Sequence, residues 1–215
     1  MTLTRWFRLL SLLGVGAVLC SAQWVNLITQ KGVPNGKDIQ GWEVIGDGYW
    51  SIWKDGTVVG QRGEASKAKG QSWLYTKKEY GEFDLQLQYW NRYYGNSGLS
   101  IRDVARAKEY DIPSGSRPSA IGYEIQINAH DVKFPTGSVY HFVPAKGGKE
   151  NEFDWNSLEI QSRNSGITVL LNGVKVSFFE GDPKRSLTGP IGLQLHDGTA
   201  MAMWRNIRIR ELKKR

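Results

Sequence analysis

The sequence predicts an all-β protein, built as a two-sheet antiparallel β-sandwich. Many short segments alternate apolar and polar residues at every second position, which is typical of strands with one buried side. Residue pairs suited to tight hairpins separate several of these segments. No stretch carries an apolar stripe of helical period over three turns, and short strands at near-regular spacing favour a sandwich or barrel.

The turn chemistry supports this assignment. Four Asp-Gly or Asn-Gly pairs can adopt the positive φ angles that two-residue hairpin turns require. The clearest is Leu171-Asn172-Gly173-Val174, where two apolar runs meet at Asn-Gly. The other pairs are Asp47-Gly48, Asp55-Gly56 and Asp197-Gly198.

The chain divides into three parts. Residues 1–22 are expected to be a signal peptide, residues 23–41 an irregular segment containing Pro34 and Gly36, and residues 42–215 a single domain. The strands expected in that domain are, in order, Trp42–Ile45, Tyr49–Trp53, Thr57–Gln61, Ser72–Tyr75, Phe83–Trp90, Gly98–Arg102, Tyr123–Asn128, Gly137–Phe142, Ser157–Arg163, Ile167–Leu171, Val174–Phe179, Ile191–His196 and Ala202–Leu212.

The first 22 residues have the pattern of a secretory signal. Arg5 and Arg8 precede the apolar run Leu9–Leu19, and small residues end at Ala22. We therefore expect export to the periplasm or the extracellular space after cleavage near Ala22. The apolar run is short for a stable membrane span. A retained anchor and lipid attachment at Cys20 are the alternatives, although Leu19 is a poor residue to precede a lipidated cysteine.

The charge of the chain does not favour nucleic acid. The formal net charge is +7, from 28 basic and 21 acidic residues. Removing Arg5 and Arg8 leaves 26 basic residues and a charge of +5. The segment Arg205–Arg215 carries six basic residues against Glu211, so it accounts for all of that excess. A charged strand end and tail is not an interleaved basic and aromatic surface.

Several strands would present polar side chains with fixed hydrogen-bonding geometry on their outer face. In Gly98–Arg102 and Tyr123–Asn128 the apolar residues point inward, which leaves Arg102, Glu124 and Gln126 outside. The segment Ile191–His196 likewise leaves Gln194 and His196 outside. Phe83–Trp90 would add Asp84, Gln86 and Gln88. If these strands share one sheet, their polar side chains form one surface suited to a polar ligand such as a sugar, with Arg102, Gln126 and Gln194 expected to bind it.

Aromatic residues adjoin this surface. Trp90, Tyr93 and Tyr94 cluster beside Gly95-Asn96-Ser97-Gly98 at a strand end. Aromatic rings next to polar groups suit the stacking of sugar rings, so Trp90 or Tyr94 is expected to stack on a sugar and Asn96 to bind it. Packing in the core or at its rim is the alternative for each ring.

The chemistry of the predicted surface is restricted. Glu124 could be a general base, a metal ligand or the ionic partner of Arg102, and His196 could be a base or a metal ligand. There is no Gly-x-Ser-x-Gly elbow, P-loop or His-Glu-x-x-His motif. Glucanases of this architecture carry Glu-x-Asp-x-x-Glu, whereas this chain has Gln126 in the second place. Glycoside hydrolysis by two carboxylates is therefore disfavoured.

The ordered motifs resemble the 3-keto-disaccharide hydrolase domain family (DUF1080) from about Trp42 to Leu212. The motifs that carry the resemblance are Ser72-Trp73-Leu74-Tyr75-Thr76, Tyr80-Gly81-Glu82-Phe83-Asp84-Leu85, Asn96-Ser97-Gly98-Leu99-Ser100-Ile101-Arg102, Gly122-Tyr123-Glu124-Ile125-Gln126-Ile127, Thr136-Gly137-Ser138-Val139-Tyr140, Trp155-Asn156-Ser157-Leu158-Glu159-Ile160, Leu171-Asn172-Gly173, Gly189-Pro190-Ile191-Gly192-Leu193-Gln194-Leu195-His196 and Arg205-Asn206-Ile207-Arg208-Ile209.

The resemblance implies a concanavalin-like jelly roll that cleaves glycosides oxidised to a ketone at C3. A base would remove the acidified C2 proton and a stabilised enolate would expel the glycosidic oxygen. The resemblance also implies a divalent cation, carried over onto Glu124, Gln126 and His196. Asn128 stands where the family often has an acidic residue. The rival hypotheses are a non-catalytic carbohydrate-binding or laminin-G-like module and a structural domain without a ligand.

Export makes a direct prediction about the mature chain. If the signal is cleaved after Ala22, amino-terminal sequencing of the protein recovered outside the cytoplasm should start at Gln23. A mature chain that starts at Cys20 with an added lipid mass would instead establish the lipoprotein alternative.

Overall fold

The computed structural model describes residues 22–34, 38–63, 70–107 and 121–212. The expected signal peptide, apart from Ala22, and the basic tail beyond Leu212 lie outside the described residues. No helix in the described part of the chain is long and apolar enough to cross a membrane.

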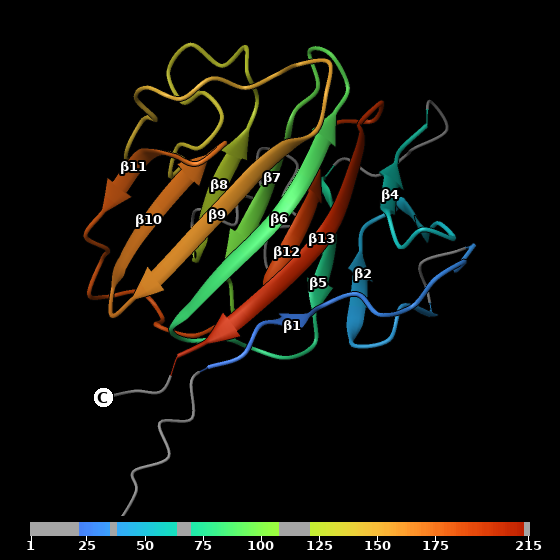
Figure 1. The fold of residues 1–215 in the computed structure, drawn as a ribbon, viewed down its shortest axis with the longest axis horizontal. Coiled ribbons are helices and arrows are strands. Elements are labelled where there is room, and N and C mark those ends of the chain that lie inside the picture. The colour runs from blue at the N-terminus through green and yellow to red at the C-terminus, as the bar shows by residue number, and fades with distance from the viewer. Residues whose placement is uncertain (1–21, 35–37, 64–69, 108–120, 213–215) are drawn as a thin grey trace, which may run out of the picture.

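Two antiparallel sheets form the fold, which confirms the predicted class (Figure 1). One sheet has eight strands in the order β11-β10-β9-β6-β13-β4-β3, with β1 pairing with β13, and the other has five in the order β2-β5-β12-β7-β8. The strands are β1 Val25–Asn26, β2 Trp42–Ile45, β3 Tyr49–Ile52, β4 Val58–Gln61, β5 Ser72–Thr76, β6 Phe83–Asn91, β7 Ser97–Ile101, β8 Tyr123–Ile127, β9 Asn156–Arg163, β10 Gly166–Leu171, β11 Val174–Phe179, β12 Ile191–Leu195 and β13 Met201–Glu211.

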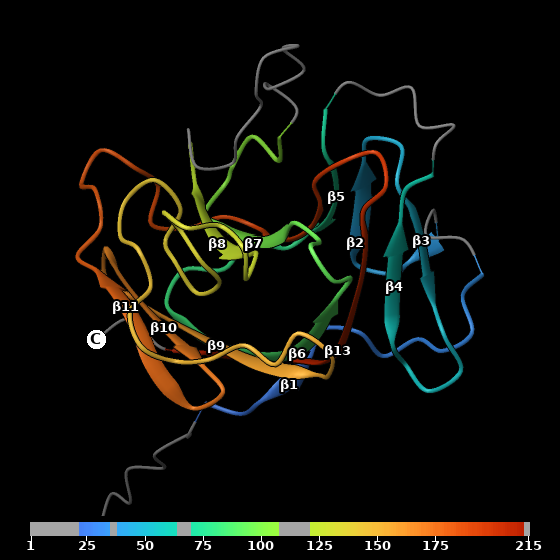
Figure 2. The ribbon, with the colours of Figure 1, turned by 90° about the horizontal axis from the view of Figure 1, so that it is seen from above.

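The sheets pack face to face around a hydrophobic core. Figure 2 shows the two layers edge-on, with β6 and β9 in one and β7 and β8 in the other. The inward residues predicted for the five-stranded sheet are fully buried there, including Leu99, Ile125 and Leu193. On the opposite side of the core, the rings of Trp50 and Trp204 stack with centroids 5.5 Å apart. The alternation of apolar residues therefore fixes which face of each strand is buried.

Three elements differ from the sequence prediction. The irregular segment contains β1, which pairs Val25 with Ile209. The expected strand Gly137–Phe142 is instead a coiled segment that meets β8 through the isolated bridge between Val139 and Ile125. Most importantly, β6 belongs to the eight-stranded sheet, so its outer residues Asp84, Gln86 and Gln88 face away from β7, β8 and β12. Alternation identifies the two faces of a strand but not the sheet it joins.

Removal of the buried tryptophan stack should destabilise the fold. Trp204→Ala would leave a cavity beside Trp50, because Trp204 is completely buried, and we expect it to lower the free energy of unfolding by about 3–5 kcal/mol. The matched control is Trp53→Ala, since Trp53 is 50% exposed, and its effect should stay within about 0.5 kcal/mol. Urea denaturation measures both, and similar losses would contradict this account of the core.

Candidate functional site

The outer face of the five-stranded sheet gathers polar and aromatic side chains from four neighbouring strands. The register pairs Glu124 with Ser100 and Gln126 with Gly98 across β8 and β7. It also pairs Gly192 with Ser100 across β12 and β7, and Gly192 with Tyr75 across β12 and β5. Side chains of one parity therefore form one continuous surface. Its members are Trp73, Tyr75, Gly98, Ser100, Glu124, Gln126, Gly192 and Gln194, and we call it the polar face.

Two glycines shape the polar face. A Cβ atom on Gly98 would lie 2.8 Å from Glu124 Oε1 and 3.1 Å from Gln194 Oε1. A Cβ atom on Gly192 would lie 2.4 Å from the Tyr75 ring. Both glycines therefore leave space directly above the sheet that side chains of neighbouring strands occupy. The Glu124 carboxylate and the Gln194 amide come together over Gly98 because β7 has no side chain at that position.

A hydrogen-bond network orients these groups. Gln194 Nε2 donates to Glu124 Oε1 at 2.8 Å and to Gln71 Oε1 at 3.1 Å. Gln126 Nε2 donates to Asp131 Oδ2 at 3.2 Å. The side-chain amide nitrogens of Gln194 and Gln126 are thus both hydrogen-bonded to neighbouring side chains.

Three buried acceptors at this face remain open. The side-chain oxygens of Gln194, Gln126 and Asn96 are shielded from solvent and have no hydrogen-bond partner among the described residues. Glu124, Gln126 and Gln194 are each no more than 3% exposed. Burying an acceptor without a donor is unfavourable, so a ligand that supplies hydroxyl donors would be stabilised at this face.

A second pair of titratable groups lies next to Ser100. Tyr75 Oη and Asp103 Oδ2 are 2.8 Å apart, and both residues are completely buried. Burial and the nearby Asp103 carboxylate raise the pKa of Tyr75 well above its usual value. Burial also raises the pKa of Asp103, while hydrogen bonds from Tyr75 and the Ala107 amide oppose that change. The pair is therefore biased toward holding protons.

Arg102 does not join the polar face, which corrects the expected convergence. Its φ of 58° turns the chain out of the strand alternation after β7. Nη1 donates to Ser165 O at 2.9 Å, and Nη2 donates to Ser162 Oγ at 2.7 Å and Asn164 O at 2.6 Å. The guanidinium therefore ties the end of β7 to the β9–β10 hairpin of the other sheet. This geometry gives it a structural role in place of the expected contact with a sugar.

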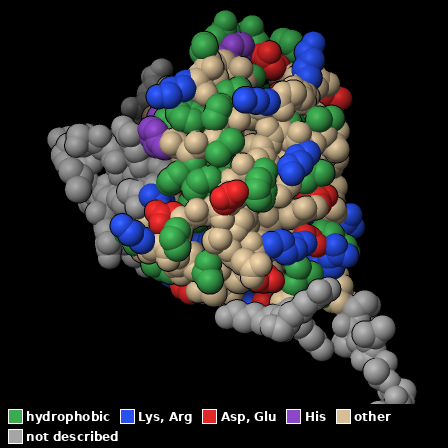
Figure 3. Space-filling model, turned by 90° about the vertical axis from the view of Figure 1, so that its left-hand side faces the viewer, with side chains coloured by type: hydrophobic (Ala, Val, Ile, Leu, Met, Phe, Trp, Pro, Cys, Tyr) green, Lys and Arg blue, Asp and Glu red, His purple; other side chains and the backbone are tan. Residues whose placement is uncertain are grey.

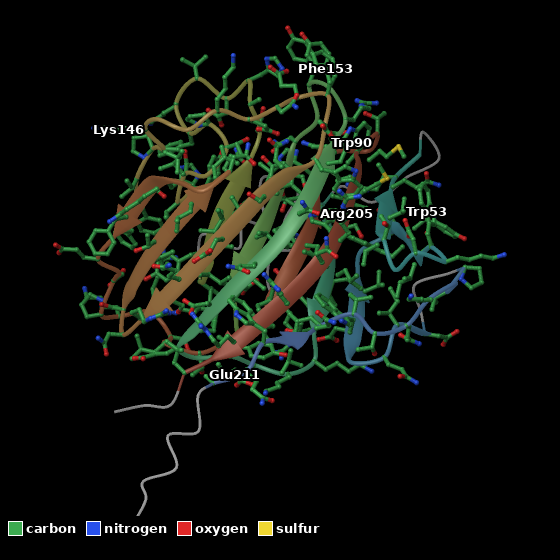
Figure 4. All side chains as sticks on the ribbon, in the orientation of Figure 1. Trp53, Trp90, Lys146, Phe153, Arg205 and Glu211 are labelled. Carbon is green, nitrogen blue, oxygen red and sulfur yellow. The ribbon has the colours of Figure 1, made fainter. Side chains whose placement is uncertain are left out.

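Trp90 is also separated from the polar face. It lies on β6 opposite Met203 of β13, in the eight-stranded sheet. Figure 4 shows it on the same layer as Arg205. A groove of about 460 Å³ lies on this sheet. Its polar groups satisfy one another, as when Gln86 Nε2 donates to Glu159 Oε2 at 2.8 Å. The expected stacking of Trp90 on a sugar held by Glu124 is therefore incompatible with the sheet assignment.

His196 and Asn96 lie at one end of the polar face. His196 directly follows β12 and lies on the same face as Gln194, which is two residues before it. The β12–β7 pairing joins Leu193 to Leu99, and the same antiparallel register continued to the strand ends brings His196 opposite Asn96. His196 as a whole is exposed, yet partial desolvation lowers the pKa of its imidazole. Asp197 raises this pKa, and Arg62 lowers it further. A lowered pKa leaves the imidazole neutral near pH 7, when it can accept a proton.

The donor groups at the polar face do not form a metal-ligand cluster. Within the part of the chain that the structure describes, no three His, Cys, Asp or Glu side chains gather closely enough to hold a metal ion. Glu124 Oε1 already accepts a hydrogen bond from Gln194. Because an amide oxygen such as that of Gln126 can also bind a cation, the divalent cation expected at Glu124, Gln126 and His196 stays a prediction, and no chemical step is assigned to a metal.

The family assignment follows from the sequence as a whole. The model of the 3-keto-alpha-glucoside-1,2-lyase-like domain matches residues 23–210. The chain belongs to this family. The match confirms the resemblance expected from the ordered motifs, several of which supply the polar face. No curated protein matches the chain.

Solved structures confirm the fold of this lyase-like domain. A protein of Parabacteroides distasonis ATCC 8503, provisionally assigned as a glycosyl hydrolase, is 23% identical with a TM-score of 0.64, and the match covers 88% of this chain and 100% of that one. Carbohydrate-binding module CBM66 from Bacillus subtilis is 16% identical with a TM-score of 0.56, covering 80% and 96%. The β-glucanase of Bacillus licheniformis is 11% identical with a TM-score of 0.52, covering 90% and 99%.

Sequence reasoning missed two residues of the lyase-like domain's polar face and one residue beside it. Trp73 lies outside with Tyr75, and the centroids of their stacked rings are 5.4 Å apart. Asp103 lies just past the strand pattern. No local signal marked the two aromatics, since Trp73, Leu74 and Tyr75 are three consecutive apolar residues and only the structure shows that Leu74 is the inward one. The signal for Asp103 was absent, because its placement depends on the turn at Arg102.

The role of Arg102 in the lyase-like domain can be tested by stability. Arg102→Met keeps the length of the side chain but leaves the acceptors of the β9–β10 hairpin without donors. We expect a loss of about 2–4 kcal/mol in the free energy of unfolding. Arg92→Met is the control, because Arg92 is exposed, and should change stability by at most about 0.5 kcal/mol. Near-native stability of Arg102→Met would rule out this structural role.

Proposed function

We propose that this protein cleaves 3-keto-glycosides by elimination, with Glu124 as the base that removes the proton from C2. The observation that carries the proposal is the buried Glu124–Gln194 pair over Gly98, surrounded by open acceptors. Membership of the 3-keto-alpha-glucoside-1,2-lyase-like family supports the same chemistry. The substrate is a saccharide oxidised at C3.

The proposed reaction needs one base and one proton donor. The ketone at C3 acidifies the C2 proton, which passes to the base as an enolate forms. The enolate electrons then form the C1–C2 double bond, and the C1–O bond to the leaving saccharide breaks. The leaving oxygen takes up a proton, and addition of water at C1 completes hydrolysis. This sequence explains why a second carboxylate in the arrangement of two-carboxylate hydrolases is not required.

The polar face supplies candidate groups for each step. Glu124 has its carboxylate fixed by Gln194, which limits the rotation of the base. The open oxygens of Gln126, Gln194 and Asn96 can accept hydrogen bonds from sugar hydroxyls. They are the substrate-positioning residues of this proposal.

Tyr75 is the candidate proton donor at the Ser100 end of the same face. Its phenol donates to Asp103 Oδ2 at 2.8 Å, and burial raises its pKa well above the usual value, so it keeps its proton. A reorientation of this hydroxyl would let it donate toward the developing enolate oxygen or the leaving group. His196, at the Asn96 end, is the alternative base, since its lowered pKa keeps it neutral.

The remaining parts of the proposal concern where the protein acts. The signal pattern in residues 1–22 supports action outside the cytoplasm on exported or environmental saccharides. The neutral charge of the chain before its basic end is consistent with an uncharged ligand.

Replacement of the proposed base should abolish turnover while leaving the fold intact. Purified Glu124→Gln is expected to cleave 3-keto-maltose at least about 100-fold more slowly than the wild type, because it loses general base catalysis. The control His196→Gln should lose about tenfold or less. Product formation followed by mass spectrometry, with added divalent cation and with a chelator, measures both variants.

The outcomes of this assay separate the rival functions. If the wild-type protein forms no product in either condition and Glu124→Gln still binds sugar, the catalytic proposal is rejected and the protein is a carbohydrate-binding module. A larger loss in His196→Gln than in Glu124→Gln would transfer the role of base to His196.

The gap above β7 gives a second test. Gly98→Ala places a methyl group 2.8 Å from Glu124 Oε1, 3.1 Å from Gln194 Oε1 and 3.2 Å from Glu124 Cγ. The buried carboxylate must leave its hydrogen bond with Gln194 to make room, so stability should fall by about 1–3 kcal/mol. Turnover should fall at least about tenfold, because the base is misplaced. If the folded Gly98→Ala variant turns over substrate as fast as the wild type, the role assigned to the contact between Gly98 and Glu124 is contradicted.

A further inference from the structure

An exposed aromatic cluster lies beside the Asn96 end of the polar face. It joins three loops: Tyr93 and Tyr94 follow β6, His130 follows β8, and Phe153 precedes β9. The exposed fractions of Tyr93, Tyr94 and Phe153 are 48%, 66% and 79%. Figure 4 labels Phe153 at this end of the molecule, and Figure 3 shows hydrophobic, histidine and acidic side chains together along that edge.

The rings of the cluster hold one another in fixed orientations. Tyr94 stacks on His130, with centroids 3.8 Å apart and planes inclined by 13°. Tyr93 stands edge-on to His130 at 5.3 Å and lies nearly parallel to Phe153 at 5.4 Å. His130 Nε2 and Glu152 Oε2 are 2.7 Å apart, which fixes the imidazole behind Tyr94. His130 covers one face of Tyr94 and Tyr93 meets the ring in a T-shaped contact at 4.6 Å, yet Tyr94 is still 66% exposed.

The backbone is built to present Tyr94. Its φ is 55°, and the Gly95 amide donates to Arg92 O at 2.6 Å, which closes a tight turn. A Cβ atom on Gly95 would lie 2.5 Å from that same carbonyl oxygen, so only glycine fits there. The turn directs Tyr94 outward at the start of the segment that enters β7.

The strand bounds place this ring beyond the end of β7. The Glu124 carboxylate lies over Gly98, the second residue of β7, and Tyr94 lies three residues before Ser97, where β7 begins. The turn closed by Gly95 and Arg92 holds the Tyr94 ring past the strand end, whereas the sugar at Glu124 would lie over the strand itself. Sugars that extend beyond the reacting one can reach this ring.

We propose that Tyr94, backed by His130 and flanked by Tyr93 and Phe153, forms a distal subsite for the leaving saccharide. This inference rests on the proposed function, since it takes the reacting sugar to lie at Glu124. It names the substrate class: oligosaccharides that extend beyond the oxidised sugar, rather than small 3-keto-glycosides alone.

The surroundings of the cluster favour a sugar over another apolar ligand. A sugar ring presents C–H groups to an aromatic face and hydroxyls at its edge, so its site needs both kinds of group. The shallow cleft at the cluster is lined by Asn91, Arg92 and Glu150 as well as by the aromatic rings. Asn96, whose buried Oδ1 has no partner among the described residues, lies between Tyr94 and Gly98 in the sequence.

The test compares two probes that differ only in length. Methyl 3-keto-α-glucoside has no leaving saccharide, whereas maltotriose oxidised at C3 of its non-reducing unit places two sugars beyond the reacting one. Binding of both probes is measured by calorimetry in the Glu124→Gln background, so that no probe is consumed. The ring resonances of His130 are followed by NMR.

Variants at the cluster are compared with a matched exposed aromatic. Tyr94→Ala should weaken binding of the trisaccharide about five- to tenfold and leave the methyl glycoside unchanged. Tyr94→Phe should bind both probes as the parent does, because stacking needs only the ring. Phe178→Ala, at a residue that is 49% exposed on β11, should change neither. The trisaccharide should shift the His130 resonances, and the methyl glycoside should not.

The results also separate this inference from the proposed function. If Tyr94→Ala abolishes the preference for the trisaccharide but the wild-type protein shows no turnover, the subsite is retained and the catalytic proposal is rejected. Equal binding of both probes, no binding of the trisaccharide, or unchanged binding in Tyr94→Ala would overturn the distal subsite.

Discussion

The candidate site depends on the absence of a side chain at Gly98. In an antiparallel sheet the outer surface of a central strand is normally filled by its own side chains. Here β7 leaves that space to the two strands beside it, and Glu124 from β8 meets Gln194 from β12 within it. Gly192 provides the same clearance on β12, where the Tyr75 ring lies over the backbone. The reactive groups are therefore positioned by strand pairing rather than by loops.

The two outer faces of the sandwich show why polarity alone does not identify a site. The eight-stranded sheet carries a dense polar ladder, in which Arg205 donates to Gln88 and Arg210 donates to Asp84. Its groups satisfy one another, which favours a stabilising role. The five-stranded sheet has fewer polar groups, but amide oxygens of Gln126 and Gln194 are buried without a partner among the described residues. The unsatisfied face is therefore the one that we propose for ligand binding.

The sequence predicted the fold and the core of the site because both follow from alternation. Leu99 and Ile125 point inward, and Glu124, Gln126 and Gln194 meet outside, as period-2 patterns require. The failures have a different origin. Trp90 was misplaced because no local pattern tells which sheet a strand joins. Arg102 was misplaced because its left-handed backbone conformation breaks the alternation that had identified it. Tertiary pairing decided both.

Arg102 also has a consequence for how the molecule opens. Its guanidinium holds the carbonyl oxygens of Asn164 and Ser165, in the β9–β10 hairpin of one sheet, to the end of β7 in the other. The strand that carries Gly98 is thus anchored across the sandwich as well as within its own sheet. Local opening of that hairpin would release β7, so the amide protons of both segments should exchange with solvent as one cooperative unit. The polar face then exists only while both sheets are intact, and it cannot be separated as a smaller folded fragment.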